Sequence, residues 1–386
     1  MQYDYSETVE YLLHWFDYNA RILRWRIEPS AYYIWISEIM LQQTRVEAVK
    51  TYFDHFVEEL PDIKALAECE EERLLKLWEG LGYYNRVRNL QKAAQIIMKD
   101  YQGQLPSDYQ ELLKLPGIGS YTAGAIASNV YNIPVPSVDG NVLRVAKRIA
   151  GSYDDITKAA VKRQLENDLR EIMPEDRPGD FNQSLMELGA VICIPNGKPL
   201  CEQCPVMHLC KAFQEGIQMK IPVKSPKKSR KIEDKTLLLI EFQYIEKKER
   251  SERLINYYAI QKRMQKGLLA GMWQLPSLEG KKSTLQIKKY LQTFIQCYQN
   301  NFDIAIEPLE ESKHIFSHIE WHMKGYHIKL IQKKESAKVE DAKAQINELL
   351  VYSGATKQQD LTWIQAKQLK DYALPSAFDA YRGYIQ

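Results

Sequence analysis

The fold of the N-terminal half is decided by one stretch, Leu115-Pro116-Gly117-Ile118-Gly119-Ser120-Tyr121-Thr122-Ala123. A helical pattern over 108–114 stops at the proline, two glycines permit a tight turn, and small residues then begin a second helix. Backbone N–H groups at such a turn, and at the N-terminus of the second helix, favour an anion. The stretch therefore predicts a helix–hairpin–helix element with a phosphate-sized site at Gly117, Gly119 and Ser120. An ordinary hairpin between two helices is the alternative.

Upstream of the hairpin, an apolar helix-like run over 34–41 carries one carboxylate, Glu38. The side chains one helical turn before and after Glu38 are mainly apolar. Desolvation of this kind raises the pKa of a carboxyl group and suits a proton donor. The alternative is a glutamate at the wet edge of an amphipathic helix. Gln42, Gln43 and Thr44 follow the run directly.

Length and composition set the frame for these motifs. A chain of 386 residues is too long for one ordinary core, which predicts two domains. Its 45% hydrophobic and 26% charged residues are typical of a folded protein. The net charge of +2 is too small to indicate a polyanionic partner by itself. Without a long apolar run or a leader-like start, we expect a cytoplasmic protein with no membrane partner.

Helical periodicity dominates the first half of the sequence. Patterns over 6–23, 46–57, 62–67, 70–79 and 86–101 are joined by short breaks with no strand pattern between them, which predicts an all-α domain. We expect Arg26 in a loop beside Glu38. There it is either a surface cation or a ligand for a base or a phosphate.

A second glycine-rich stretch runs from Gly80 to Arg88, with the sequence GLGYYNRVR. Tyr83 and Tyr84 place flat rings beside the positive charges of Arg86 and Arg88. Such a loop suits wedging between nucleic-acid bases while holding phosphates. A turn whose tyrosines pack on the core is the alternative.

The second candidate carboxylate is in Val138-Asp139-Gly140-Asn141-Val142, where a further helix begins. Asp139 is at the N-cap position, where a carboxylate is preferred simply because it satisfies free N–H groups. Hydrolysis of a glycosidic bond, however, generally needs two carboxylates, one for the leaving group and one for the developing cation. Both roles remain open for Asp139.

Four cysteines follow, Cys193, Cys201, Cys204 and Cys210, with intervening gaps of seven, two and five residues. Zinc modules usually carry two close cysteine pairs, and here only Cys201 and Cys204 are close. An iron–sulfur cluster held by four thiolates fits this spacing better.

Residues 217–235 form a basic, proline-containing segment that predicts a linker, either a solvated tether or a track for a phosphate backbone. Beyond it the period changes. Residues 235–244 and 254–260 are β-like, 284–298 is helix-like, and an alternating run through 321–330 slips in phase at Gly325, as a bulge would make it. The C-terminal half is therefore predicted to be an α/β or α+β domain.

Together these motifs make the chain similar to the helix-hairpin-helix DNA glycosylases, and it resembles the MutY-type adenine DNA glycosylases over nearly its full length. The resemblance implies a helical glycosylase domain over 1–216, with a six-helix lobe at about 24–133 and a cluster lobe formed by 1–23 and 134–216. The linker at 217–235 and a Nudix-like domain over 236–386 would follow. It also implies a [4Fe-4S] cluster on the four cysteines, and adenine paired with 8-oxoguanine or guanine in duplex DNA as the substrate. We expect a monomer.

The resemblance also implies residue roles. Glu38 would protonate adenine N7 and Asp139 would stabilise the oxocarbenium-like sugar, with Tyr121 and Asn141 orienting the pair. Glu187 and Arg26 would stand behind the pocket, and Gln43 and Tyr83 would enter the base stack. Phe316-Ser317-His318 matches the family's 8-oxoguanine-detecting loop. The remaining candidates for DNA contact are Leu41, Gln42, Thr44, Arg86, Arg88, Gly117, Gly119 and Ser120.

Three departures from related patterns shape the expectation. Relatives that cleave the DNA backbone carry a lysine where this chain has Tyr121, so a monofunctional glycosylase with little or no lyase activity is expected. The family's usual first cysteine gap is six residues, and the seventh is expected to bulge near Asn196-Gly197. A Nudix-like segment over 267–273 is not followed by an acidic cluster for Mg²⁺, so the second domain is interpreted as a recognition module.

Three other functions fit the sequence less well. Tyr121 and the appended domain disfavour a bifunctional lyase of the endonuclease III type. A non-catalytic DNA-binding protein would not need both Glu38 and Asp139. The missing acidic segment disfavours a Nudix pyrophosphohydrolase.

Overall fold

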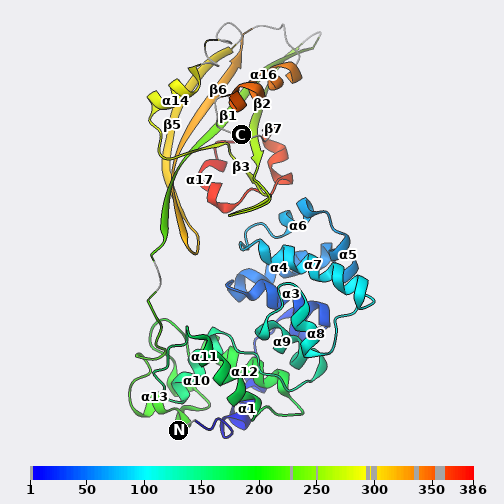
Figure 1. Cartoon of the computed structure of the whole chain (residues 1–386), viewed down its shortest axis with the longest axis vertical. Coiled ribbons are helices and arrows are strands. Elements are labelled where there is room, and N and C mark those ends of the chain that lie inside the picture. The colour runs from blue at the N-terminus through cyan, green and yellow to red at the C-terminus, as the bar shows by residue number, and fades with distance from the viewer. Residues whose placement is uncertain are drawn as a thin grey trace. The chain divides into compact units, whose positions relative to one another are not determined.

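The computed structural model describes residues 3–226, 229–248, 251–292, 296, 302–333, 339–352 and 361–386 (Figure 1). They form two compact units, Met1–Lys227 and Lys228–Gln386. The boundary lies inside the predicted linker, but little of that segment is a free tether. Val223 forms a backbone β-bridge with Asp155, and the Ser225 hydroxyl donates a hydrogen bond to the Asp155 carboxylate. The first strand of the second unit already begins at Lys231.

The first unit is helical, as predicted. Its helices are α1 (Thr8–Asn19), α2 (Arg24–Ile27), α3 (Ala31–Leu41), α4 (Val46–Glu59), α5 (Ile63–Glu68), α6 (Glu71–Leu77), α7 (Asn85–Asp100), α8 (Tyr109–Lys114), α9 (Ser120–Tyr131), α10 (Gly140–Ile149), α11 (Ala159–Arg170), α12 (Pro178–Val191) and α13 (Lys211–Gln214). One local expectation was wrong, because Arg26 lies in the short helix α2 and not in a loop.

Helix α3 is the central helix of the first lobe. Its apolar side chains are buried nearly all round, including Trp35, Ile36 and Met40, which are fully enclosed. A helix that is apolar on every side must be surrounded, and α3 packs against α4, α7 and α9. Ser30 caps its N-terminus by accepting a hydrogen bond from the Tyr33 N–H.

The predicted helix–hairpin–helix element is formed by α8 and α9. Gly117 has a φ of 80°, a left-handed conformation that a side chain would strain, and Gly119 is the N-cap residue of α9. The small residues of α9 allow close packing. A Cβ on Gly124, for example, would lie 2.6 Å from the carbonyl oxygen of Pro136.

The second lobe packs α1, α10, α11 and α12 around one apolar core that includes Leu12, Val142, Leu165, Phe181 and Leu188. Pro136, Ser137 and Val138 lead from α9 of the first lobe into α10 and are buried. Two turns of 3₁₀ helix, Cys201–Gln203 and Met207–Leu209, and the helix α13 then complete the lobe.

The second unit is built on a mixed sheet. Its described strands are β1 (Lys231–Lys248), β2 (Ser251–Lys262), β3 (Trp273–Gln274), β4 (Ser277–Glu279), β5 (Phe302–Ile315), β6 (Ile319–Gln332) and β7 (Leu361–Ile364). The order is β3-β2-β1-β6-β5, with β4 beside β1 and β7 beside β2. Only the central pair, β1 and β6, is parallel among the strand pairs described.

Alternating side chains of β1 and β6 enter two cores on opposite faces of this sheet. One core contains residues of α14 (Thr284–Tyr290) and α16 (Val339–Tyr352). The other contains Phe378, the N-cap residue of α17 (Asp379–Arg382), and Tyr381 within that helix. These helices are drawn around the sheet in Figure 1. Phe294 and Ile295, predicted to continue the helix of α14, lie outside the described residues. The C-terminal half is thus an α/β domain, as expected.

The predicted bulge at Gly325 is on the other strand of the pair. The pairing shifts between Pro308 and Glu311 of β5, opposite Gly325 of β6. Gly325 is needed for a different reason, since a Cβ there would lie 2.3 Å from the ring of Tyr381. The phase slip in the sequence therefore marked the right place but the wrong strand.

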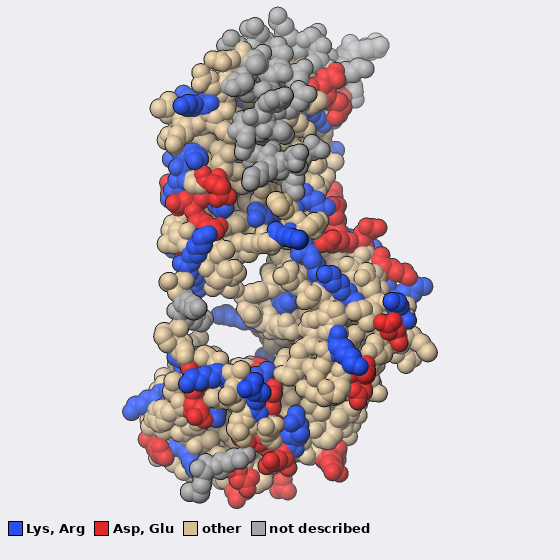
Figure 2. Space-filling view, viewed as in Figure 1, with Lys and Arg blue, Asp and Glu red and all other residues tan. Residues whose placement is uncertain are grey.

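Charge is mixed on both units. Figure 2 shows Lys and Arg interspersed with Asp and Glu over the visible face of each. This agrees with the near balance of 52 basic and 50 acidic residues. None of the helices in the described parts of the chain combines the length and apolar character that crossing a membrane requires.

Candidate functional site

One pocket in the first unit collects the two candidate carboxylates. It encloses about 150 Å³, room for several water molecules or a small planar ring. Eight of the predicted site residues line it: Arg26, Glu38, Leu41, Thr44, Tyr121, Asp139, Asn141 and Glu187. They come from α2, α3, α9, α10, α12 and the residues flanking α3 and α10, so segments far apart in the sequence meet here.

Glu38 has the environment of a carboxyl group that keeps its proton. Its Oε2 is buried and has no hydrogen-bond partner among the described residues. Burial raises the pKa of Glu38 to about 7, and the neighbouring Asp139 adds to that rise, while a hydrogen bond with Tyr121 and the charge of Arg26 oppose it. Near neutral pH, Glu38 can therefore exist in both protonation states.

Asp139 has richer polar surroundings. Its Oδ1 accepts hydrogen bonds from the Asn141 and Val142 N–H groups, each at 2.8 Å, and its Oδ2 accepts one from Asn141 Nδ2 at 2.8 Å. Burial raises the pKa of Asp139, but these hydrogen bonds and the charge of Arg144 act against that rise. Asp139 is thus the cap of α10 and, at the same time, a wall of the pocket.

The orientation of Asn141 is fixed from behind by Arg144. Arg144 Nη2 donates to Asn141 Oδ1 at 2.9 Å and to the carbonyl oxygen of Gly189 at 2.7 Å, so the amide nitrogen of Asn141 points to Asp139. Arg144 Nε also donates to the carbonyl oxygen of Cys193 at 2.8 Å. The carboxylate therefore cannot rotate without disturbing α10 and α12.

Glu187 is a buried anion held by two arginines. Arg26 Nη2 donates to its Oε2 at 2.9 Å, and Arg21 donates through its Nε, its Nη2 and its backbone N–H. Burial alone would raise the pKa of Glu187, but these hydrogen bonds and charges lower it. Arg26 is only 17% exposed and mainly serves this ion pair. Its charge still acts on Glu38.

Gln43 and Tyr83 are exposed residues on two turns of the same lobe. Both have left-handed backbone, with φ of 59° for Gln43 and 48° for Tyr83, and Tyr83 is 46% exposed. Left-handed backbone at residues other than glycine is uncommon and often marks a functional position. Gln42, beside Gln43, instead points inward, where its Nε2 donates to Thr122 Oγ1 at 3.4 Å.

The two arginines of the glycine-rich stretch do not face solvent as phosphate ligands would. Arg86 directs its Nη1 and Nη2 at carbonyl oxygens of α3 and of residues 81–82, and Arg88 pairs with Glu71 at 2.8 Å. Arg86 is therefore occupied by carbonyl groups of its own lobe, and contact of Arg86 or Arg88 with DNA stays a prediction. A sequence pattern cannot tell an arginine that binds a ligand from one that binds its own backbone.

At the hairpin, Ser120 is already engaged by protein groups. Its hydroxyl donates to Glu166 at 3.0 Å and accepts from Lys162 Nζ at 3.4 Å. Space beside Gly119 is open, with nothing near the position of a Cβ, whereas a Cβ on Gly117 would lie 2.9 Å from Asn89. The open backbone at Gly119 and the N-terminus of α9 are the features suited to an anion.

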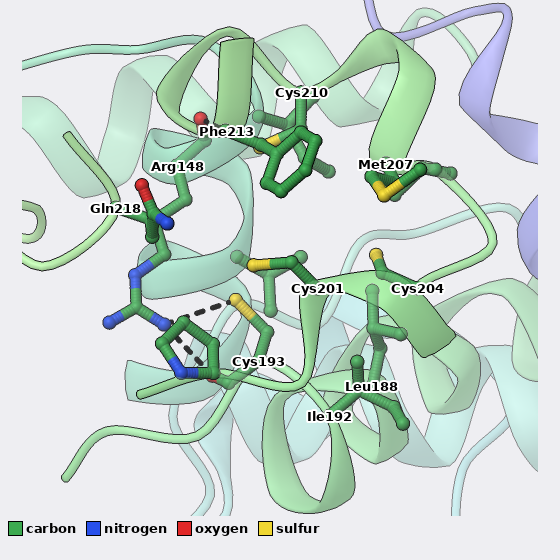
Figure 3. A pocket seen from close by; sticks show the side chains of 14 residues that line it. Arg148, Leu188, Ile192, Cys193, Cys201, Cys204, Met207, Cys210, Phe213 and Gln218 are labelled. Atoms are coloured by element: carbon green, nitrogen blue, oxygen red, sulfur yellow. Dashed lines mark hydrogen bonds between the residues drawn. The ribbon is translucent and has the colours of Figure 1, made fainter. Parts of the chain in front are cut away.

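The four clustered cysteines line a second pocket, shown in Figure 3, between α10, α12 and the 3₁₀ turns. Apolar groups surround them, and this burial raises the pKa of Cys204 to about 12 and also raises the pKa of Cys201 and Cys210. Arg148 donates to Cys193 Sγ at 3.3 Å. A cationic metal centre would offset the cost of four thiolates here, so the donor set fits such a group.

The seventh residue in the first cysteine gap is accommodated on the surface. Pro195 to Lys198 are exposed, Gly197 has a φ of 81°, and the Leu200 N–H closes the loop on the Ile192 carbonyl at 3.0 Å. Cys193 still joins the other three at the pocket.

Phe316-Ser317-His318 forms the hairpin between β5 and β6 in the second unit. Ser317 and His318 are exposed at its tip, while the Phe316 ring packs against Trp321 at 4.9 Å. The Phe316 N–H bonds to the Ile319 carbonyl at 2.8 Å, which closes the turn.

Several pocket residues were missed by the sequence analysis, among them Arg21, Gln183 and Met186. Both Gln183 and Met186 are on α12. Gln183 is one helical turn before Glu187, so the helical period could have indicated it, whereas Met186 immediately precedes Glu187. Arg21 follows the first helix with no motif around it, and nothing in the sequence pointed to it.

Family models match both units of the chain. Residues 36–171 match the model of the HhH-GPD superfamily base excision DNA repair proteins, and residues 253–382 match the NUDIX domain model. A solved thermostable thymine-DNA glycosylase is 27% identical, with a TM-score of 0.49 over 54% of this chain and 96% of that one.

Curated relatives extend the match over most of the chain. An adenine DNA glycosylase of Buchnera aphidicola subsp. Schizaphis graminum is 32% identical over 81% of this chain and 84% of its own length. One from Schizosaccharomyces pombe is 34% identical over 80% of this chain and 79% of its own length. In Arabidopsis thaliana the relative is longer, and 55% of it is matched at 34% identity. With its helix–hairpin–helix unit, its two-carboxylate pocket and its Nudix-like unit, the chain belongs to the adenine DNA glycosylases, a family of base excision repair enzymes that hydrolyse N-glycosyl bonds.

Proposed function

We propose that this enzyme removes adenine paired with 8-oxoguanine or guanine from duplex DNA, with little or no cleavage of the DNA backbone. The observation that carries the proposal is the single pocket that holds Glu38 and Asp139 in unlike surroundings. Two carboxylates whose environments differ are suited to an acid role and an anion role in one glycosidic cleavage.

Glu38 acts as the general acid in this proposal. Its protonated form donates to N7 of the extruded adenine, which makes the base a neutral leaving group. Burial keeps a substantial fraction of Glu38 protonated near pH 7, since its pKa is raised to about 7. After the bond breaks, the carboxylate accepts a proton from the attacking water.

Asp139 stays ionised and stabilises the positive charge that develops on the sugar. Its hydrogen bonds from Asn141 and Val142 hold the carboxylate in place before the reaction, so little reorganisation is needed. Tyr121 contacts Glu38 and orients its carboxyl group. The Arg26–Glu187 pair fixes the wall behind the base.

Extrusion of the adenine is assigned to Gln43 and Tyr83, which enter the base stack from the two exposed turns. A DNA phosphate binds at Gly119 and the N-terminus of α9. The four cysteines would hold a [4Fe-4S] cluster, which would crosslink the loop after α12. Ser317 and His318 hydrogen-bond the edge of 8-oxoguanine, with Phe316 anchoring their hairpin.

Weak lyase activity follows from the chemistry at position 121. Cleavage of the backbone through a Schiff base needs an amine nucleophile at the sugar, and Tyr121 offers a hydroxyl whose pKa is raised well above its ordinary value by burial. The product should therefore be an intact strand with an abasic site.

A gel assay of Glu38→Gln tests the proposal. Duplexes carrying adenine opposite 8-oxoguanine, guanine, cytosine or thymine are incubated with the unsubstituted enzyme or with Glu38→Gln. The DNA products are then analysed with and without alkali. The unsubstituted enzyme should release adenine opposite the first two, with strand breaks only after alkali. Glu38→Gln should bind the 8-oxoguanine duplex and release adenine at least about a hundredfold more slowly. Ordinary turnover by this variant would reject Glu38 as the acid.

A further inference from the structure

Two turns of the first lobe carry the residues proposed to open the duplex. We call residues 42–45, after α3, the Gln43 turn, and residues 80–84, before α7, the Tyr83 turn. They are distant in sequence and each holds an exposed residue in left-handed backbone. We propose that Arg86 is a positioning residue that locks these two turns into one wedge. This inference rests on the proposed roles of Gln43 and Tyr83 in extruding the base.

The contacts of Arg86 join both turns directly. The four N–H groups of its two terminal nitrogens are shared among six acceptors: the carbonyl oxygens of Ile39 (2.8 Å), Met40 (2.9 Å), Gln42 (2.6 Å), Leu81 (3.0 Å) and Gly82 (3.2 Å) and the hydroxyl of Thr44 (3.3 Å). Nη1 thus serves the C-terminal end of α3, and Nη2 bridges from Thr44 to the Tyr83 turn.

These acceptors are groups that helix ends leave unsatisfied. The last carbonyls of α3 have no partner within the helix, and the carbonyls of Leu81 and Gly82 belong to a turn. By taking them all, one guanidinium replaces the hydrogen bonds that would otherwise need water. The Gln42 backbone and the Thr44 hydroxyl, on either side of Gln43, and the backbone immediately before Tyr83 are therefore held by the same side chain.

Ring contacts extend this link to the wedge itself. The guanidinium carbon lies 5.5 Å from the centroid of the Tyr83 ring and 5.3 Å from that of the buried Trp78. Arg86 therefore touches the inserting side chain and its backbone at once. Trp78 in turn donates from Nε1 to the Gly82 carbonyl at 3.1 Å, which adds a second hold on the Tyr83 turn.

Only arginine has the geometry for this task. Its planar fork directs donors to two sides, while the three donors of a lysine diverge from one nitrogen. Burial lowers the pKa of Arg86 to about 10, so the group is still charged at neutral pH and a lysine would preserve the charge. Arg86→Lys therefore removes the bridge selectively.

The mechanical consequence is that the two turns move as one body. Insertion of Gln43 and Tyr83 must separate stacked bases, which costs free energy. If the two turns could move independently, they would be displaced by the bases instead of separating them. The role of Arg86 is thus confined to opening a paired duplex. It is not required once an adenine is already unpaired.

The test compares two duplexes under single-turnover conditions. One carries adenine opposite 8-oxoguanine, and the other carries adenine opposite an abasic-site analogue, where no partner base has to be separated. Arg86→Lys and Tyr83→Ala should each slow release from the first duplex by about tenfold to a hundredfold and change the second by less than about threefold. Activity on the second duplex also shows that the variant is folded.

The controls separate the possible failures. Arg73→Lys, which alters a surface ion pair with Glu59 in the same lobe, should behave as the unsubstituted enzyme on both duplexes. Adding Arg86→Lys to Tyr83→Ala should slow release by a much smaller factor than adding it to the unsubstituted enzyme, because half of the wedge that Arg86 joins is already lost. With 2-aminopurine replacing the adenine, the rise in fluorescence on extrusion should slow in step with release.

Each contrary result has a definite meaning. An Arg86→Lys enzyme that matches Arg73→Lys on both duplexes, or is slowed equally on both, overturns the positioning role, as does a double variant whose defects multiply. If instead Tyr83→Ala behaves as the unsubstituted enzyme on the paired duplex, the proposed wedge itself is rejected.

Discussion

At the scale of single residues, the pocket contains three carboxyl side chains in three different environments. Glu38 has a buried oxygen without a partner, Asp139 accepts three hydrogen bonds, and Glu187 is clamped by two arginines. Chemically these side chains are almost the same. Their surroundings differ in the way that the proposed roles require, with Glu38 as the proton donor, Asp139 as the anion and Glu187 as part of the framework.

The raised pKa of Glu38 should also cost stability. A carboxyl group whose pKa rises from 4.5 to about 7 on folding binds its proton more tightly in the folded state. Stability is then lost as pH rises between these values, by about 3 kcal/mol. Glu38→Gln removes that loss, so its Tm should exceed that of the unsubstituted protein at pH 8 and approach it at pH 5. A Tm difference that does not change with pH would contradict the raised pKa.

Residue type and spacing indicated those pocket residues whose neighbours in the sequence are themselves distinctive. Glu38 stood alone in an apolar run, and Asp139 stood at a helix start. Arg86 shows the limit, because a buried donor to distant carbonyls and an exposed phosphate ligand have the same letter in the sequence. Its partners on α3 are more than 40 positions away, as the 47-residue separation from Ile39 illustrates.

At the scale of elements, the start of α10 combines a structural and a chemical duty. Asp139 caps this helix and also faces the pocket. The two duties can be separated because asparagine caps a helix about as well as aspartate but carries no charge.

Asp139→Asn and Asp139→Ala should therefore differ in stability and agree in activity. Alanine should lower the free energy of unfolding by about 1 kcal/mol, while asparagine should leave it nearly unchanged. Both should lose most adenine release, since neither can stabilise a cation. Denaturant unfolding and single-turnover rates measure the two effects. Full activity in the asparagine variant would reduce Asp139 to a cap.

Helix positions were predictable because periodic burial repeats many times within each helix. The expected pattern over 86–101 became α7 (Asn85–Asp100), for instance. Short and irregular elements were less so. The four residues of α2 are too few to show a period, and the bulge is at Leu309 and Glu310 although the phase slip occurs at Gly325 of the neighbouring strand.

At the scale of the whole molecule, the residues proposed for chemistry and those proposed for damage recognition belong to different units. The residues that the structure describes around the carboxylate pocket all belong to the first unit, and the Phe316-Ser317-His318 hairpin is part of the second. The two-domain division was visible in the sequence as a change of period across a basic segment. No pattern in either half could reveal which tertiary contacts would form.

Ser317→Ala combined with His318→Ala should thus reduce discrimination but spare chemistry. We expect the rate of adenine release opposite guanine to be nearly unchanged and the preference for 8-oxoguanine over guanine to narrow by about tenfold, as loss of base-edge hydrogen bonds predicts. Paired single-turnover assays on the two duplexes give this ratio. An unchanged ratio would place the detector elsewhere.

The surface loop between Cys193 and Cys201 has a consequence for recognising such chains. Its additional residue is taken up by exposed positions around Gly197, while the sulfur of Cys193 keeps its place at the pocket. The segment between Cys193 and Cys201 therefore accepts one residue more than the six expected from the family while both cysteines still line the pocket. A search pattern written with one fixed interval would overlook this enzyme, whereas one that lets that interval vary and keeps the Cys201–Cys204 and Cys204–Cys210 intervals strict would retrieve it.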